Sequence, residues 1–400
     1  MGKTRGLGWI GLLTLGVGCA SLLDLPDGDY HVECVAGETQ CVGKTVQVCQ
    51  DGLWTNGEVC PYGCSNGVCG GECSPGDKRC LGNQPQSCDN FSAFQDTAEC
   101  TVSAPVCDAG LCKLPLSCTG LPSNCGPSAD ESCCNVKAVS GGTYNRSNAP
   151  SAPAMISDFR LDRFEITVGR FRKFVEAYPS NKPKANAGAH PLIAGSGWDA
   201  AWDANLPADQ VALKSALKCD ATYQTWTDTP MANENLPMNC ISWYEAFVFC
   251  AWEGGRLPTE AEWNYAAAGG NEQREYPWSN PPNATTIDVT YAVYMCAGDG
   301  SQAGICAFAD ILKVGSKSPK GDGRFGQADL AGSVWEWNLD VYDDYNADCA
   351  NCTNLSMIPL RMIRGGGWSQ QAPLLLSSNR NVNSPELRGI YNGARCARTP

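Results

Sequence analysis

The sequence predicts an α+β domain with little regular secondary structure, preceded by small disulfide-rich modules. Three observations support this fold class. Cysteines crowd the N-terminal third, where seventeen of the 25 precede residue 135. Two short helices are predicted between residues 242 and 270, in a chain that carries 43 glycines and 25 prolines. Apolar periodicity begins only after about residue 136, so we expect the hydrophobic core in the C-terminal part.

The two predicted helices both begin at capping boxes. A hydroxyl residue precedes a glutamate by three positions, as Ser242/Glu245 and Thr259/Glu262. Each such pair satisfies backbone N–H groups that a helix start leaves open. A glycine pair ends each run, so we predict helices over about 243–253 and 260–268. In the first, Trp243, Phe247 and Cys250 form a core-facing stripe.

A strand and a helix are predicted upstream of this pair. Phe159, Leu161 and Phe164 surround charged positions, as in a half-buried strand. Five apolar residues then follow helical spacing, namely Val168, Phe171, Phe174, Val175 and Tyr178. We place the start of the domain near residue 136, so that it spans 136–400.

The stretch 182–210, rich in proline, glycine and alanine, is predicted to be a surface loop. Its two tryptophans, Trp198 and Trp202, are expected to pack locally, and a ligand platform is the alternative. The chain has two histidines, His31 and His190. One histidine in the C-terminal domain excludes two-histidine iron sites and three-histidine zinc sites there. We expect His190 to be solvated.

The formal net charge of −13 excludes few functions but disfavours nucleic acid and anionic membrane surfaces as partners. The cysteine content favours an oxidising compartment. Residues 1–18 are predicted to be a signal peptide, since Lys3 and Arg5 precede an apolar run too short to span a bilayer. The protein is therefore expected to be exported.

The predicted signal peptide ends in Leu15-Gly-Val-Gly-Cys-Ala, which is similar to a bacterial lipoprotein box with Cys19 as the lipidated residue. Setting Cys19 aside leaves an even number of cysteines, which favours this interpretation. A lipid anchor at the outer membrane or cell surface follows, with residues 19–33 as a tether. The alternative is cleavage after Ala20, which gives a secreted or periplasmic protein.

A six-cysteine pattern occurs twice, over residues 34–72 and 73–113. The corresponding cysteines are 34, 41, 49, 60, 64 and 69 in the first copy and 73, 80, 88, 100, 107 and 112 in the second. Units of about 40 residues bury too little apolar surface to fold alone, so disulfides are expected to replace a core. Zinc is the alternative. We expect the modules to act as a stiff spacer, or else as an interaction stalk, joined to the domain by a cysteine-containing linker over 114–135.

Four blocks of the C-terminal part resemble the formylglycine-generating enzyme family, also called the sulfatase-modifying factor family. These are Phe159–Phe174, the stretch Gly255-Arg-Leu-Pro-Thr-Glu-Ala-Glu-Trp263, the stretch Asp329-Leu-Ala-Gly-Ser-Val-Trp-Glu-Trp337, and Arg361–Trp368 with Gly393–Arg398. The resemblance implies the formylglycine-generating-enzyme fold, which is C-type-lectin-like. Fold alone is a weaker guide to activity.

Oxidase activity in that family depends on two cysteines that hold copper(I). The family's spacing places them here at Gln370 and Leu375, beside Trp368 and Ser369 as a candidate groove. An amide and an isobutyl group supply no thiolate, and copper(I) prefers soft sulfur ligands. The resemblance therefore implies no catalytic residues at these positions, and copper is not expected.

The resemblance also implies disulfides. Cys250 should pair with Cys396, whereas a second family disulfide is missing because its positions hold Ala267 and Arg380. For the remaining cysteines we expect the sequence-nearest pairs, which are Cys219–Cys240, Cys296–Cys306 and Cys349–Cys352. The last pair lies in a Cys-Ala-Asn-Cys motif, so a redox or metal site is the alternative there.

The stretch from Asp329 to Glu336 resembles a family calcium loop. Carried over by position, the ligands are Asp329, Gly332, Val334 and Glu336. Oxygen donors in a tight loop suit a hard cation. The alternative is that Glu336 bonds backbone amides and no ion binds.

These observations favour an exported, lipid-anchored cell-envelope protein whose C-terminal domain is a binding or scaffolding module without oxidase activity. The expected partner is a protein or glycan ligand at the cell surface. The alternatives are an active formylglycine-generating oxidase, another activity in the same groove, or a purely structural envelope component.

Overall fold

The computed structural model describes residues 33–81, 84–90, 92–301, 303–345, 349–356 and 360–400. The predicted signal peptide and Cys19 lie outside these residues. The chain divides into two compact units, Met1–Gly71 and Glu72–Pro400. Within the described ranges, none of the helices has the length and apolar character needed to cross a membrane.

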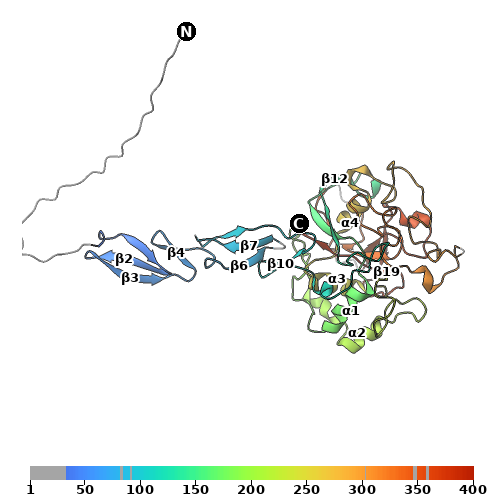
Figure 1. Cartoon of the computed structure of the whole chain (residues 1–400). Coiled ribbons are helices and arrows are strands. Elements are labelled where there is room, and N and C mark those ends of the chain that lie inside the picture. Colours follow the sequence, from blue (N-terminus) through green and yellow to red (C-terminus); the bar gives the residue numbers. More distant parts are fainter. Residues whose placement is uncertain (1–32, 82–83, 91, 302, 346–348, 357–359) are drawn as a thin grey trace, which may run out of the picture. The chain divides into compact units, whose positions relative to one another are not determined.

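The two six-cysteine modules repeat the same strand plan (Figure 1). In the first, β1 (Thr39–Val42), β2 (Thr45–Gln50) and β3 (Leu53–Val59) form an antiparallel sheet, followed by the hairpin of β4 (Gly63–Ser65) and β5 (Val68–Gly70). In the second, β6 (Lys78–Leu81), β7 (Gln84–Cys88) and β8 (Phe94–Asp96) precede the hairpin of β9 (Val106–Asp108) and β10 (Leu111–Lys113). Strands that are neighbours in sequence pair within each sheet and hairpin, so these pairings are local contacts.

Disulfides join equivalent cysteines in both modules: the first pairs with the third, the second with the fifth and the fourth with the sixth. The bonds are Cys34–Cys49, Cys41–Cys64 and Cys60–Cys69, then Cys73–Cys88, Cys80–Cys107 and Cys100–Cys112. With so many disulfides the protein is an exported one, because a reducing cytosol does not maintain them.

Two non-cysteine residues recur in the modules for identifiable reasons. Gln47 and Gln86 each bridge three strands, since the amide accepts from one neighbouring strand and donates to the other. Gly67 and Gly110 both have positive φ, and their N–H groups lie 3.2 and 3.1 Å from the sulfur of the second cysteine of the module. A Cβ at Gly67 would lie 2.6 Å from backbone of Thr39, so a side chain does not fit there.

The segment that follows the modules packs against the C-terminal domain. It contains the short helix η1 (Leu116–Cys118) and the disulfides Cys118–Cys134 and Cys125–Cys133. The backbone N–H of Ser117 donates to the buried Glu253 carboxylate at 2.7 Å. Arg163 forms an ion pair of 2.9 Å with Glu131. The predicted linker therefore has contacts typical of a domain edge.

Three small sheets and four α-helices form the rest of unit Glu72–Pro400 among its described residues. The sheets are β11 (Val136–Val139) with β14 (Phe159–Asp162) and β20 (Ala397–Arg398), β12 (Gly142–Asn145) with β13 (Pro153–Ile156) and β16 (Cys349–Ala350), and β18 (Asn381–Asn383) with β17 (Arg361–Arg364), β15 (Trp335–Val341) and β19 (Asn392–Gly393). The helices are α1 (Val168–Ala177), α2 (Gln210–Ala216), α3 (Trp243–Trp252) and α4 (Glu260–Ala267). Short 3-10 turns connect them, so the α+β prediction with little regular structure is confirmed.

Helices α3 and α4 begin at the predicted capping boxes. Ser242 and Thr259 accept from the backbone N–H of Glu245 and Glu262, and both glutamates return the bond. The prediction of a single core-facing stripe on α3 is too narrow, because Trp243 to Cys250 are all buried. This helix lies inside the domain, and its apolar sequence covers every face.

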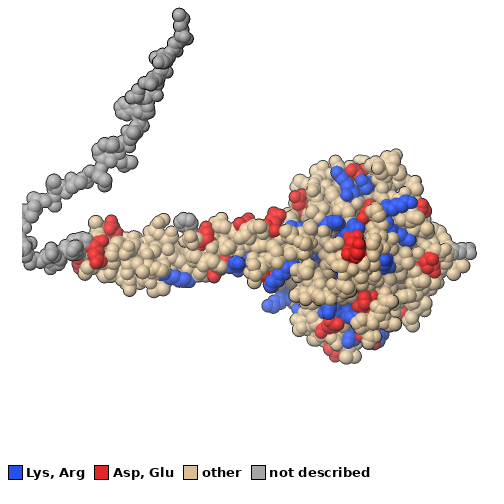
Figure 2. Space-filling model, in the orientation of Figure 1, with Lys and Arg blue, Asp and Glu red and all other residues tan. Residues whose placement is uncertain are grey.

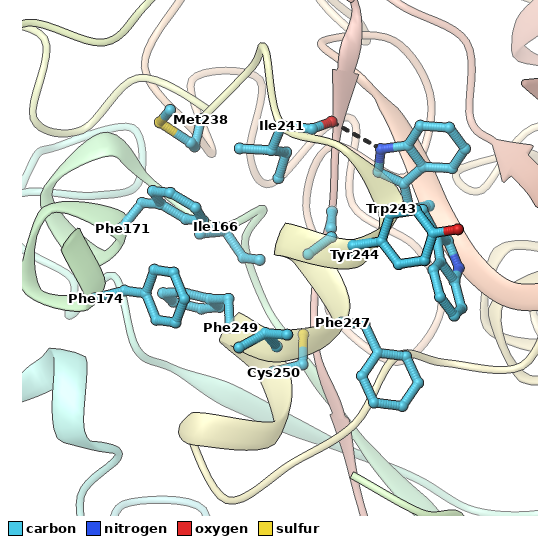
Figure 3. Packing of buried hydrophobic residues seen from close by; sticks show 14 of the residues in the cluster. Ile166, Phe171, Phe174, Met238, Ile241, Trp243, Tyr244, Phe247, Phe249 and Cys250 are labelled. Atoms are coloured by element: carbon cyan, nitrogen blue, oxygen red, sulfur yellow. Dashed lines mark hydrogen bonds between the residues drawn. The ribbon is translucent and has the colours of Figure 1, made fainter. Parts of the chain in front are cut away.

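The core is built around α3, as Figure 3 shows for residues of α1, α3 and their neighbours. The Trp337 indole donates to the Ile241 carbonyl at 3.1 Å. Trp198 packs on Phe247 with ring centroids 5.5 Å apart, which confirms local packing of the loop tryptophans. The expectation that His190 is solvated is wrong: it is 5% exposed and its Nε2 lies 3.4 Å from Glu262.

Candidate functional site

The candidate groove lies on the segment that follows β17. Trp368 is 1% exposed and is held between Tyr223 and Tyr391, with ring centroids 5.2 and 5.5 Å away. Its indole N–H donates to the Ile390 carbonyl at 3.2 Å. Trp368 is therefore a core residue that anchors the segment, and its ring is not a free binding surface.

Ser369 and Gln370 are partly exposed beside this anchor. The backbone around them is fixed by a neighbouring loop, since Met295 N–H donates to the Gln370 carbonyl at 3.0 Å and Cys296 N–H to the Trp368 carbonyl at 2.9 Å. The Gln370 amide is 3.4 Å from the Ser369 hydroxyl. This edge offers amide and hydroxyl groups to a ligand, which suits hydrogen bonding.

Leu375 is fully buried at the end of the 3-10 helix η6 (Ala372–Leu375). It packs with Tyr276, Ala292 and Ala331 in an apolar cluster. Neither Gln370 nor Leu375 provides a sulfur ligand, so the residues at these two positions do not fit copper(I). Throughout the described ranges every cysteine is in a disulfide, and no thiol is left to replace them.

The predicted pairs in the C-terminal domain are all present. They are Cys250–Cys396, Cys219–Cys240, Cys296–Cys306 and Cys349–Cys352. At the missing family disulfide, Ala267 is buried and Arg380 forms an ion pair with Glu260 on α4, with N–O distances of 2.6 and 2.9 Å. An ion pair therefore fastens this segment to α4.

The predicted calcium loop is buried, and its two acidic side chains are bonded to the protein. The Glu336 carboxylate accepts two hydrogen bonds of 2.7 Å from Arg395 and one of 2.8 Å from Trp263. The Asp329 carboxylate accepts from the N–H of Gly315. The partners of Glu336 are therefore side chains, and not the backbone amides predicted for a loop without an ion.

Sequence reasoning missed Glu165, which reaches the same loop. It is fully buried and accepts hydrogen bonds from the Ser333 hydroxyl at 2.8 Å and the Val334 N–H at 3.1 Å. A glutamate between Phe164 and Ile166 in an apolar run was the available signal. Burial, and then the charges of Asp329 and Glu336, raise the pKa of Glu165 well above its usual range.

Burial also raises the pKa of Asp329 to about 6. A cation would relieve this crowding of negative charge. The described part of the chain nevertheless contains no group of three or more His, Cys, Asp or Glu side chains arranged to hold a metal ion. Two of the four predicted ligands are the backbone carbonyls of Gly332 and Val334, so calcium binding through Asp329, Gly332, Val334 and Glu336 stays a prediction.

Charges of both signs and two cavities mark other parts of the surface. The face of the domain in Figure 2 carries both signs of charge, and they are interspersed. Two cavities, of about 410 and 230 Å3, lie beside the loop that contains Met231. Their linings do not include Trp368, Ser369, Gln370 or Leu375, so these cavities are distinct from the candidate groove.

A family model and several known proteins are similar to this chain. Residues 124–400 match the family described as "Sulfatase-modifying factor enzyme 1-like domain". The chain is 28% identical over 269 residues to the inactive C-alpha-formylglycine-generating enzyme 2 of Bos taurus, covering 62% of this chain and 79% of the relative. It is 25% identical over 305 residues to the formylglycine-generating enzyme of Thermomonospora curvata, covering 66% and 93%. The solved structure of PvdO from Pseudomonas aeruginosa is 20% identical, with a TM-score of 0.48, and the match covers 72% of this chain and 100% of PvdO.

Proposed function

The chain belongs to the sulfatase-modifying factor enzyme 1-like domain family, and from that premise we propose that it is an exported, lipid-anchored cell-envelope protein whose family domain binds or scaffolds a partner without oxidase activity. The partner class is a protein or glycan ligand at the cell surface. The modules over residues 34–113 serve as the spacer. One relative is itself named an inactive formylglycine-generating enzyme, which supports a non-catalytic role in this family.

The observation that carries the proposal is the chemistry at the two family positions. Copper(I) prefers soft sulfur ligands, and Gln370 supplies only an amide. Leu375 is fully buried, and its side chain would present only methyl groups to a metal ion. The described cysteines are paired, and a disulfide sulfur is not a thiolate ligand.

The proposal is tested by mass spectrometry of a sulfatase-motif peptide incubated in air with oxidised protein and copper(I), since aldehyde formation requires oxygen as the oxidant. The expected result is an unchanged peptide mass, and a separate sample of the untreated protein should show no titratable thiol after denaturation. The variant Gln370→Cys with Leu375→Cys is the matched control, because it restores sulfur without restoring the surrounding shell. A mass loss that corresponds to aldehyde formation by the unaltered protein would overturn the proposal.

Anchoring through Cys19 is tested by detergent phase partition. The wild type is expected in the detergent phase, and Cys19→Ser is expected in the aqueous phase. Recovery of the wild type from the aqueous phase with Ser21 as its first residue contradicts the anchor and leaves export intact.

Calcium is the cofactor that family membership supports. If calcium binds the folded loop alone, its stabilisation of the domain grows with the logarithm of the calcium excess. We therefore expect chelation to lower the melting temperature, and Glu336→Gln to remove that response. An equal melt with and without chelator, in both proteins, rejects calcium at this loop.

A further inference from the structure

A third cavity lies between the second cysteine-rich module and the C-terminal domain, which belong to the same compact unit. Its volume is about 270 Å3. Cys107 of β9 lines it from the module, whereas the loop around Ala189, the end of α3 at Ala251 and the end of β20 line it from the domain. We call this space, defined by Cys107, Ala189, Ala251, Arg256 and Arg398, the junction cavity.

The charges that line the junction cavity are positive. Among the described residues, its charged side chains are Arg256 and Arg398, and no carboxylate lines it. Both arginines are buried, with 3% and 1% of their surface exposed. Cys107 is in a disulfide with Cys80 and carries no charge. The lining is therefore complementary to a group that accepts hydrogen bonds, and a cation finds no counter-charge in it.

Arg398 has one edge of its guanidinium without an acceptor. Its Nη1 donates to the Asp162 carboxylate, but Nε and Nη2 are buried and have no hydrogen-bond partner among the described residues. Oε2 of Glu253 lies 3.8 Å from Nη2, which is too far for a hydrogen bond, and that oxygen accepts from Arg170 at 2.6 Å. The Nε–H and Nη2–H groups of one guanidinium edge form a fork that matches the two oxygens of a carboxylate.

Arg256 adds a further donor. Its Nη1 and Nη2 each donate to the Glu262 carboxylate at 2.6 Å, whereas its Nε is buried and has no partner among the described residues. A buried charged donor without a hydrogen bond is costly, so native proteins satisfy such groups with a ligand or with ordered water. The three unpartnered groups of these two arginines are all donors, so the group that satisfies them is an acceptor.

The charge balance favours a carboxylate over phosphate or sulfate. Each guanidinium already neutralises a carboxylate of the chain, since Arg256 is paired with Glu262 and Arg398 with Asp162. The junction cavity thus offers a hydrogen-bonding fork with little surplus positive charge. A doubly charged anion would lose its hydration there without a full counter-charge. A carboxylate has a single charge, spread over the two oxygens that the fork matches.

The rest of the lining suits a small apolar body. Its side chains include those of Ala189, Pro191 and Ala251. The last carbonyls of α3 do not repel an anion strongly, because they already accept hydrogen bonds: that of Ala251 from Gly254 N–H at 3.1 Å and that of Cys250 from Gly255 N–H at 2.8 Å. The volume of the cavity exceeds that of one carboxylate group, so the ligand has room for a short aliphatic part.

We propose that the junction cavity binds a carboxylate group through the Nε–Nη2 edge of Arg398 and the Nε of Arg256, with a short apolar body in the remaining space. Because Cys107 of the second module lines the same cavity, the bound ligand lies between the module and the domain. The inference does not depend on the proposed function, since the positions from Trp368 to Leu375 do not line this cavity.

The test is a ligand-observed NMR titration of the whole oxidised protein with propionate at constant ionic strength. Propionate is expected to bind saturably. Propionamide has nearly the same shape but no charge, and it turns an N–H2 group towards the fork, so it should bind at least about tenfold more weakly. Phosphate and sulfate should also bind more weakly than propionate.

A variant that fills the cavity locates the bound propionate. Ala189→Leu leaves both arginines in place and should weaken propionate about tenfold or more, because the larger side chain occupies the space of the ligand. Ala194→Leu is the matched control, since Ala194 is an exposed alanine of the same loop that does not line the cavity. It should change the affinity less than about twofold.

A second pair of variants assigns the fork. Arg398→Lys keeps the positive charge and removes the Nε–Nη2 edge, so it should weaken propionate about tenfold. Arg170→Lys is its control, because Arg170 is buried in the same ion-pair network with Asp162 and Glu253 but does not line the cavity. Melting curves establish that each variant is folded. If Arg398→Lys does not fold, Ala189→Leu still decides the question, since it removes no member of the network.

Four results would overturn the inference: no saturable binding of propionate, equal binding of propionamide, tighter binding of phosphate or sulfate, or equal affinities in Ala189→Leu and Ala194→Leu. Equal losses in Arg398→Lys and Arg170→Lys would overturn the role of the Arg398 edge. N-acetylglutamate amide carries the same carboxylate on a fragment of polypeptide. If it binds and Ala189→Leu abolishes the binding, the cavity accepts a carboxylate borne by a chain, whereas binding of propionate alone identifies a free small acid.

Discussion

The first cysteine-rich module and the C-terminal domain are held together by different forces. In the described part of the module, the buried hydrophobic residues are Cys34, Val46, Cys49 and Cys60, so Val46 alone lies outside a disulfide. The domain cluster around α3 buries five tryptophans among its described residues, namely Trp198, Trp226, Trp243, Trp335 and Trp337. The modules are covalent frameworks, whereas the domain has a packed core.

Chain length explains this difference. A unit of about 40 residues buries too small a fraction of its surface to offset the entropy of ordering its chain. Disulfides act on the unfolded state and so supply stability without a core. In the domain, Cys250–Cys396 closes a separation of 146 residues, but it is added to a core that already excludes water. Disulfides are therefore essential to the modules, whereas in the domain they supplement a packed core.

Removing one disulfide from each region is the strongest way to break the comparison. Cys41→Ala with Cys64→Ala should unfold the first module entirely, since no core remains to hold β1 to β3. Cys219→Ala with Cys240→Ala should leave the domain folded, at a cost of about 2–4 kcal/mol. Limited proteolysis with mass mapping of the fragments shows, for each variant, whether the module and the domain remain folded. A protease-resistant module in the first variant would refute the comparison.

Truncating a core residue should affect only the domain. Trp337 is fully buried and its indole is bonded to the Ile241 carbonyl. Trp337→Ala should lower the free energy of unfolding by about 3–5 kcal/mol, through lost burial and the cavity left behind. Denaturant titration measures the free energy of unfolding of the domain. Hydrogen exchange of the β2 amides reports on the first module, where we expect no change. Trp54→Ala in β3 is the converse control, and it should not change the denaturant concentration at which the domain unfolds.

Acid should weaken the domain through Glu262. Burial alone would raise its pKa, but Arg256 and the hydrogen bonds from His190 and Arg256 outweigh burial and lower the pKa to about 2. Because this value lies below the ordinary 4.5, ionised Glu262 stabilises the fold above pH 4.5, and the contribution is lost as pH falls towards 2. The wild type should lose about 3 kcal/mol more than Glu262→Gln over that interval. Equal losses in urea titrations at pH 6 and pH 2.5 would contradict the role of this carboxylate.

The smallest expected effect is at Gly37, one of a pair of glycines within the first module. Gly37 and Gly67 both have positive φ, but a Cβ meets nothing within 4 Å at Gly37 and collides with Thr39 at Gly67. Gly37→Ala should cost about 1 kcal/mol from backbone strain alone. Gly67→Ala should cost about 1–3 kcal/mol more from the collision. Hydrogen exchange of β2 amides ranks the two, and equal protection would show that disulfides hold the module regardless of this contact.

Local chemistry in the sequence was sufficient for much of this description. Capping boxes at Ser242 and Thr259 located α3 and α4, because the side chain and the backbone it bonds lie three residues apart. The repeat of six cysteines identified the modules. The identities of Gln370 and Leu375 removed the copper ligands, and no packing arrangement restores a thiolate to an amide or a methyl group.

Contacts between distant parts of the chain were decided only by the tertiary structure. His190 is buried because the fold brings it to Glu262, 72 positions away, and nothing local to residue 190 signals that partner. Glu165 reaches Ser333 and Val334, and Glu336 reaches Arg395, by the same kind of long-range closure. The cavities of about 410 and 230 Å3 beside Met231 likewise need the segments of Leu121, Met231 and Phe308 together. Periodicity and spacing report interactions within a helix or a turn, whereas these sites depend on which segments pack together once the whole core has formed.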